Sequence, residues 1–273
     1  MPRRIRVACL QTDAGENWEV NLKAALAMVR QALRLKTRLI GLPENFCFRG
    51  QDTGLERFAR EGVAEVLKEF RGLARRNRAG FLLGSMPEAS AHPKKFFNTS
   101  YLIDPTGRIA AAYKKIHLFD IDLPGVRVHE SKRTARGEQV VCGRVLGVKA
   151  GLSICYDLRF PELYRSLARR GAEIMTVPAN FTYKTGEAHW EVLLRSRAIE
   201  NQAFVIAPGQ VGVHPVTGIR SFGNSMILDP WGKILARAGR QKPEVITADL
   251  DLDFLRKLRR AFPVLRHTRL KGF

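Results

Sequence analysis

The sequence predicts an α/β fold in which two β-sheets pack face to face between outer helices, a four-layer αββα sandwich. Short apolar segments that suit strands alternate with longer segments of helical periodicity. Two similar sequences, residues 98–109 (NTSYLIDPTGRI) and 224–234 (NSMILDPWGKI), each place a DPxG turn between β-rich arms. A common turn can recur by chance, but the flanking residues agree too. We therefore expect two related halves, each contributing one sheet.

The first half contains three expected strands and two expected helices. Residues 5–11 alternate like a half-buried strand, and Asn17 can cap a helix that runs to about residue 34. The second strand, residues 39–42, is stopped by Pro43, and Glu44 follows its carboxyl end. An amphipathic helix with apolar positions between residues 63 and 73 leads into a third strand at residues 81–86.

The second half follows a long polar stretch, residues 115–139, that has little periodicity and is predicted to be a loop. A loop of that length inside a compact domain is usually functional. Residues 148–154 suit a buried strand, and Pro161 suits the first turn of the next helix. The remaining expected elements are strands at residues 174–177, 204–207 and 245–249, a loop at 180–186, and helices at 188–201 and 251–262.

No linker divides the chain, so residues 1–273 are predicted to form one domain. Residues 251–273, a basic helix and a tail, have few apolar positions with which to pack on their own. We expect this segment to lie at the interface with another subunit, which implies a homodimer or a larger homo-oligomer. Packing against the parent domain is the alternative.

Composition narrows the classes of function. Apolar content of 45% and charged content of 26% are ordinary for a globular protein, and no apolar segment is long enough to cross a bilayer. The N-terminus runs into a strand rather than a signal-peptide core, so a cytoplasmic protein is expected. The four cysteines and six histidines form no CxxC, HExxH or finger pattern, so we expect no metal and no cofactor.

The net charge of +20 favours anionic partners in general. The basic residues are spread along the whole chain and are not interleaved with aromatic residues, as a platform for single-stranded nucleic acid requires. A solvated basic surface is therefore the preferred interpretation. Nucleic-acid binding stays as an alternative of a different class, because charge alone defines no site.

Cys155 lies at a corner between an expected strand and an expected helix. Such a corner can present a thiolate beside backbone N–H groups, which suits a nucleophile. A small buried hydrophobe is the other interpretation, and the corner alone does not decide between them. Glu44 and Lys115 also follow predicted strand ends. A buried carboxylate can act as a base for a cysteine, and a lysine can stabilise both a thiolate and an oxyanion.

Three segments resemble the signature blocks of the nitrilase superfamily of carbon–nitrogen hydrolases, in the expected order: LPENF (residues 42–46), YKKIHLFDIDLPG (113–125) and GLSICYDLRFPEL (151–163). The resemblance covers nearly the whole chain. Residues 185–202 (TGEAHWEVLLRSRAIENQ) and the DPWG hairpin resemble the branch that contains deaminated glutathione amidase and omega-amidase. Taken singly, Glu44 could be a turn carboxylate and Lys115 a solvated lysine; the three blocks together favour catalysis.

The resemblance implies an αββα sandwich assembled as dimers or larger, with Glu44 as general base, Lys115 as its partner and Cys155 as nucleophile. Lys115 is chosen over Lys114 because the family's lysine lies two positions before the histidine. That histidine, His117, is a candidate base by its chemistry, but the family places it beside the lysine and outside the triad. By motif position, two further assignments follow: Glu130 orients the lysine and substrate, and the Tyr156 backbone N–H completes the oxyanion site.

For the substrate, the branch resemblance implies a terminal amide on a small carboxylated molecule, such as deaminated glutathione or the omega-amide of a keto acid. Hydrolysis would give the acid and ammonia through a cysteine thioester. Arg159 matches a position that contacts a substrate carboxylate, and Phe181 and Thr185 match a pocket loop. N-carbamoyl amino acid hydrolysis and nitrile hydrolysis are the alternatives within the superfamily. Asn224 stands where relatives often have histidine, a departure that leaves its role open.

Overall fold

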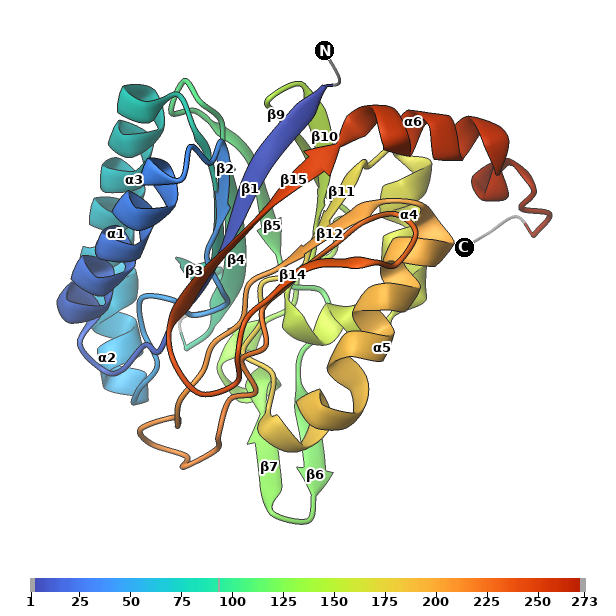
Figure 1. Ribbon diagram of the computed structural model, residues 1–273. Helices are drawn as coiled ribbons and strands as arrows, with labels where there is room; N and C mark the ends of the chain where they lie inside the picture. Colours follow the sequence, from blue (N-terminus) through green and yellow to red (C-terminus); the bar gives the residue numbers. More distant parts are fainter. Residues whose placement is uncertain (1–2, 93, 271–273) are drawn as a thin grey trace.

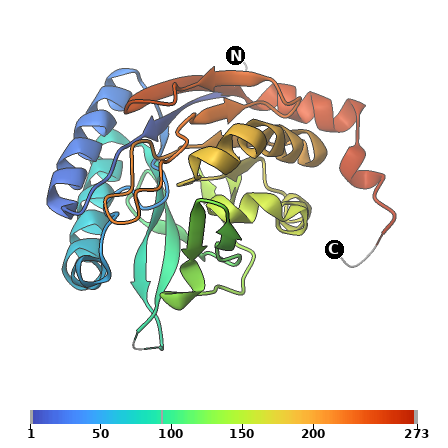
Figure 2. The same cartoon turned by 90° about the horizontal axis from the view of Figure 1, so that it is seen from below.

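The computed structural model describes residues 3–92 and 94–270. Two β-sheets lie face to face between outer helices, as Figures 1 and 2 show, which confirms the predicted αββα sandwich. Helices α1 (Trp18–Arg34) and α3 (Val63–Asn77) cover the first sheet, and α4 (Pro161–Arg169) and α5 (Tyr183–Asn201) cover the second. None of the described helices is long and apolar enough to cross a membrane.

Each sheet has a parallel centre and antiparallel edges. In the first sheet β1, β2 and β3 run parallel, and in the second β10, β11 and β12 do. The order in the first sheet is β15 (Glu244–Asp251), β1 (Arg4–Gln11), β2 (Leu39–Gly41), β3 (Gly80–Ala89), β4 (Phe96–Ile103), β5 (Ile109–Lys114), with β8 (Thr134–Ala135) beside β4. The order in the second is β14 (Ile234–Arg237), β13 (Met226–Leu228), β12 (Phe204–Ala207), β11 (Ile174–Thr176), β10 (Val148–Leu152), β9 (Cys142–Val145).

The two DPxG hairpins occupy matching edges, β4–β5 in the first sheet and β13–β14 in the second. In each turn the aspartate carboxylate, of Asp104 or Asp229, accepts the backbone N–H groups two and four residues later. Gly107 and Gly232 close the turns with φ of 77° and 82°, a region that glycine adopts without steric cost. One hairpin per sheet is what the predicted repeat requires.

Strand β1 shows why the layers form. Its side chains alternate between two apolar surroundings. Val7 and Cys9 face the core between the sheets, whereas Ala8 and Leu10 pack under the helices of the first layer. A strand buried on both faces carries a nearly continuous apolar run, as this one does. After β1, the Asn17 side chain accepts the Val20 N–H at 2.9 Å, so that Asn17 caps the start of α1 as predicted.

The prediction of an unstructured loop at residues 115–139 was wrong. The stretch contains a hairpin, β6 (Asp120–Leu123) and β7 (Val126–His129), followed by the 3₁₀ turn η2 (Glu130–Lys132). The hairpin extends beyond the sandwich in Figure 1. Its strands, DIDL and VRVH, alternate polar and apolar residues, but each alternation covers only four residues and none of them is buried, so the signal was too short to mark them as strands. The hairpin positions Glu130 directly after its second strand.

Helix α5 begins at Tyr183, within the predicted loop at 180–186 and before the predicted start at residue 188. Gly186 weakens the helical signal, yet the absence of its side chain is needed where the Phe222 ring packs against it. The other helical segments are α2 (Asp52–Arg57), the π-turn η1 (Phe58–Gly62), the 3₁₀ turn η3 (Cys155–Arg159), α6 (Leu252–Ala261) and the 3₁₀ turn η4 (Val264–Arg266).

The basic C-terminal segment is anchored partly on its own chain. Leu252, Leu255 and Leu258 of α6 are buried, and Arg259 donates to the carbonyls of Gln202 and Ala172 at 2.9 and 2.7 Å. Beyond α6, residues 263–265 are half-buried, with Leu265 packed against the core, and residues 266–270 are exposed. Residues 271–273 of the predicted interface segment lie outside the described residues.

Candidate active site

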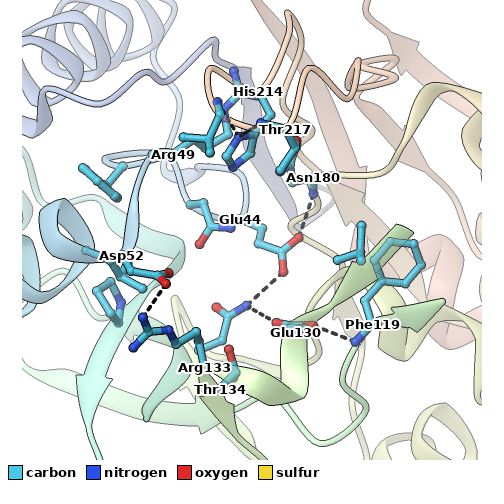
Figure 3. A pocket seen from close by; sticks show the side chains of 18 of the residues that line it. Glu44, Arg49, Asp52, Phe119, Glu130, Arg133, Thr134, Asn180, His214 and Thr217 are labelled. Carbon is cyan, nitrogen blue, oxygen red and sulfur yellow. Dashed lines mark hydrogen bonds and ion pairs between the residues drawn. The ribbon is translucent and has the colours of Figure 1, made fainter. Parts of the chain in front are cut away.

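Glu44, Lys115 and Cys155 meet at one end of the sandwich. They follow the carboxyl ends of β2, β5 and β10, and together they line a cavity of about 740 Å³. Figure 3 shows Glu44 in this cavity, with Glu130 below it and the Asn180, His214 and Arg49 side chains above. The three predicted residues therefore share one pocket, although 71 positions separate Glu44 from Lys115 in the sequence.

Lys115 is buried and lies between two carboxylates. Its Nζ atom is 2.9 Å from Glu44 Oε1 and 2.8 Å from Glu130 Oε2. Burial alone would lower the pKa of Lys115, but the charges of Glu130 and Glu44 outweigh it and hold the pKa well above its usual range. Lys114 instead pairs with Glu88 at 3.0 Å. The lysine that the motif indicated is thus the one that faces the carboxylates.

The two carboxylates are fixed by further donors. Glu44 Oε1 accepts the Asn98 side-chain amide at 3.0 Å, and Glu44 Oε2 accepts the Asn180 backbone N–H at 2.8 Å. Glu130 Oε2 accepts the Phe119 N–H at 2.7 Å, and Figure 3 shows these contacts as dashed lines. Hydrogen bonds of this kind stabilise carboxylates in their ionised form.

Cys155 begins the η3 turn with a φ of 48°, a left-handed conformation that few residues other than glycine adopt. Its own N–H donates to the Pro178 carbonyl at 2.9 Å, which holds this corner. Burial, reinforced by the negative charge of Glu44, raises the pKa of the Cys155 thiol well above its usual range, and Lys115 only partly opposes the shift. The resting sulfur is therefore a neutral thiol, and attack needs a base beside it.

Tyr156 follows Cys155 in η3, so its backbone N–H lies on the same corner. Its ring packs edge-on against Phe119, with the ring centroids 5.0 Å apart. His117 lies on the other side of η3 and binds Asp157, with Nδ1 2.7 Å from Oδ1, while stacking on Phe160. Because Asp157 is buried at the start of η3, this contact ties the lysine segment to the cysteine corner.

Arg159, Phe181 and Thr185 line a second, smaller cavity that shares Cys155 with the large one. The Arg159 guanidinium lies 5.3 Å from the centroid of the Phe181 ring, in range of a cation–π interaction. Thr185 stands in the first turn of α5 rather than in the predicted loop, and its hydroxyl pairs with that of Thr182 at 2.8 Å.

Asn224 lines neither cavity. Its side-chain amide donates to the Ala238 carbonyl at 3.1 Å, and its own carbonyl accepts the Trp190 indole N–H at 2.8 Å. The asparagine therefore joins the start of β13 to α5 and to the segment after β14. The residue that departs from the family pattern, Asn224, therefore stabilises the second sheet and does not line the pocket.

Sequence reasoning missed three residues that contact the site: Asn98, Asn180 and Gln210. The Gln210 side-chain amide donates to the Glu44 backbone carbonyl at 3.0 Å. A residue of the second half thereby fixes the backbone that carries Glu44 in the first half. Asn98 could have been noticed, since asparagine is uncommon inside a β-strand and here precedes two more polar residues that are buried. Within residues 3–92 and 94–270, no His, Cys, Asp and Glu side chains group to hold a metal ion.

The αββα sandwich is shared with a solved carbon–nitrogen hydrolase of Helicobacter pylori, which has a TM-score of 0.85 at 26% identity, covering 97% of this chain and 95% of its own. The chain belongs to that family, whose model, described as carbon-nitrogen hydrolase, matches residues 6–260. This makes the protein an enzyme of the amidase class.

Among curated relatives, a deaminated glutathione amidase of Dictyostelium discoideum is 40% identical, over 98% of this chain and 95% of its own. One from Synechocystis is 42% identical, over 95% and 96%. Among solved structures, Nit3 of Saccharomyces cerevisiae, a member of branch 10 of the nitrilase superfamily, has a TM-score of 0.87 at 30% identity, covering 98% of this chain and 97% of its own. These matches confirm the predicted superfamily.

Proposed function

We propose that the protein hydrolyses the amide of a small carboxylated substrate through a thioester on Cys155, and that deaminated glutathione is the leading candidate substrate. The observation that carries the proposal is the Lys115 ammonium held between Glu44 and Glu130 in a cavity that Cys155 also lines. Such an arrangement supplies a base, a cation and a nucleophile at one point.

In the first half of the reaction, Glu44 takes the thiol proton as the Cys155 sulfur attacks the amide carbon. The carbon–oxygen double bond opens to an oxyanion, which the Lys115 ammonium and the Tyr156 N–H stabilise. Glu44 then gives its proton to the nitrogen, the carbon–nitrogen bond breaks, and the amine leaves a thioester behind. Loss of one oxyanion donor typically costs about 100-fold or more in turnover.

In the second half, Glu44 removes a proton from water, whose oxygen attacks the thioester carbon. Collapse of this second tetrahedral intermediate breaks the carbon–sulfur bond, releases the acid and restores the thiol with the proton from Glu44. The same carboxylate serves both halves, which requires one of its oxygens to stay next to the sulfur. Glu130 stays bound to Lys115 throughout and keeps the ammonium aimed at the pocket.

Two cavities of very different size meet at Cys155. The smaller one, with Arg159 on its wall, has a volume of only about 10 Å³, so a carboxylated acyl group reaches Arg159 only if the side chains around it move aside. The larger one, about 740 Å³, leaves room for an amine with a substantial substituent. Deaminated glutathione has this form, because its keto acid is joined to cysteinylglycine, which would leave as the amine. From an omega-amide of a keto acid the leaving group would be ammonia.

The thioester is directly testable. We predict that enzyme quenched during turnover of its substrate carries an acyl group on Cys155 in peptide mass spectrometry, and that Cys155→Ala releases no amine or ammonia above background. Cys142→Ala is the matched control and should keep full activity, because Cys142 lies in neither cavity. Full turnover by Cys155→Ala, without any acylated cysteine, would contradict the mechanism.

The substrate assignment is tested by assaying deaminated glutathione, 2-oxoglutaramate, an N-carbamoyl amino acid and a nitrile with the same enzyme preparation. We expect the highest kcat/KM for deaminated glutathione. In Arg159→Ala we expect KM for carboxylated amides to rise about 10-fold or more, since a charge-assisted contact is lost, with little change for neutral amides. Preference for the carbamoyl compound or the nitrile would favour the alternative branches, and an equal rise for neutral amides would refute the Arg159 contact.

The chain is further proposed to act as one domain in a cytoplasmic homodimer or larger homo-oligomer. Val192 and Ile199 of α5, Trp231 and Phe262 are large apolar side chains that are at least 49% exposed, and the Trp231 and Phe262 rings lie 6.4 Å apart. All four cysteines are unpaired, as expected in a reducing compartment.

Sedimentation equilibrium tests the oligomer. It should give at least twice the 30.7 kDa chain mass for the parent protein, falling to the mass of one chain in Ile199→Glu; a single-chain mass for the parent protein would contradict the proposal.

A further inference from the structure

The two oxygens of the Glu44 carboxylate have different surroundings. Oε1 accepts two side-chain donors, Asn98 Nδ2 at 3.0 Å and Lys115 Nζ at 2.9 Å. Oε2 accepts the Asn180 backbone N–H at 2.8 Å. Since a carboxylate oxygen has two in-plane lone pairs, Oε1 is fully occupied by these donors, and Oε2 retains an acceptor position.

Oε2 is held from the second half of the chain, which also carries the nucleophile. Its donor, Asn180, lines both cavities, as Cys155 does. With Oε1 filled, Oε2 is the oxygen left to accept the thiol proton.

Asn98 has a second contact that explains how it is held. The same Nδ2 atom lies 3.2 Å from Glu130 Oε1, so that its two hydrogens bridge the two carboxylates. Lys115 bridges the same pair. The residue is 91% buried, being 9% exposed, and stands on β4, an element that carries none of the proposed catalytic residues. Among the described residues its side chain makes hydrogen bonds to Glu44 and Glu130 and none to Cys155, so a role in the chemistry has to pass through these carboxylates.

We infer that Asn98 is a positioning residue: together with Lys115 it fills Oε1 of Glu44, and this leaves Oε2 as the oxygen that takes the Cys155 proton. The inference rests on the proposed function, in which Glu44 is the base. Without the amide, Oε1 regains an empty acceptor position and the carboxylate can rotate or bind water there. Proton transfer from sulfur to carboxylate then loses its fixed geometry.

Two substitutions separate positioning from packing. Asn98→Asp keeps the side-chain volume but replaces the donor with an acceptor facing two carboxylates. Asn98→Ala removes the donor and leaves space. We expect kcat to fall about 100-fold in Asn98→Ala and further in Asn98→Asp, with KM within about twofold of the parent value, because the contact is made to the base and not to the substrate. Ser100→Ala, which changes a buried polar residue on the same face of β4, should behave like the parent.

A measurement without substrate gives the second readout. Alkylation of Cys155 by iodoacetamide also needs loss of the thiol proton, so its rate should fall about 10-fold or more in both Asn98 variants and stay unchanged in Ser100→Ala. Should Asn98→Ala fail to fold, the isosteric Asn98→Asp carries the test by both readouts.

The possible outcomes are distinct. Parent-like kcat and alkylation in Asn98→Asp would overturn the inference and leave Asn98 a packing role, as would a change confined to KM. If the parent enzyme hydrolyses none of the amides, the proposed function fails instead, and the alkylation rates still report whether Asn98 controls the proton acceptor of Cys155.

Discussion

A single buried ammonium, that of Lys115, holds the site together. The buried Glu44 carboxylate, the partly buried Glu130 carboxylate and the buried Cys155 thiol lie around it. Burying charge is costly unless partners and hydrogen bonds compensate, and here one cation serves two anions while backbone and side-chain N–H groups of Phe119, Asn180 and Asn98 supply the rest. Because the pKa of Lys115 is raised, its contribution to stability is complete at neutral pH and is lost only as the pH rises above the ordinary value of 10.5.

The sandwich makes this arrangement possible. Parallel strands at the centre of each sheet bring their carboxyl ends to one edge, and stacking the sheets brings the two edges together. The first half supplies Glu44 and Lys115, and the second supplies Cys155. Gln210 then reaches back from the second half to the backbone of Glu44. The base and the nucleophile are therefore fixed relative to each other by the interface between the sheets.

Much of this could be predicted from the sequence, for identifiable reasons. Strands buried on both faces can be predicted because they are continuous apolar segments. The polar residues directly after these strands indicated where the active site would form. The β6–β7 hairpin was missed because its alternation of polar and apolar residues covers only four residues in each strand. The start of α5 was missed because Gly186 serves tertiary packing against Phe222. An asparagine inside a strand could have drawn attention to Asn98, but not to its role. That role depends on contacts with Glu44 and Glu130, which are distant in sequence, and no local pattern encodes these contacts.

The central claim is that Lys115 compensates the charge of a buried carboxylate, Glu44, and of a partly buried one, Glu130. Its most direct test is the free energy of unfolding in urea at neutral pH for the parent, Lys115→Met, and Lys115→Met combined with Glu130→Gln. The account predicts that Lys115→Met loses about 3–5 kcal/mol, because the buried Glu44 and the partly buried Glu130 are left without their cation, and that the double variant regains part of that loss because one charge is gone. Parent-like stability in Lys115→Met, or a further loss in the double variant, would contradict it.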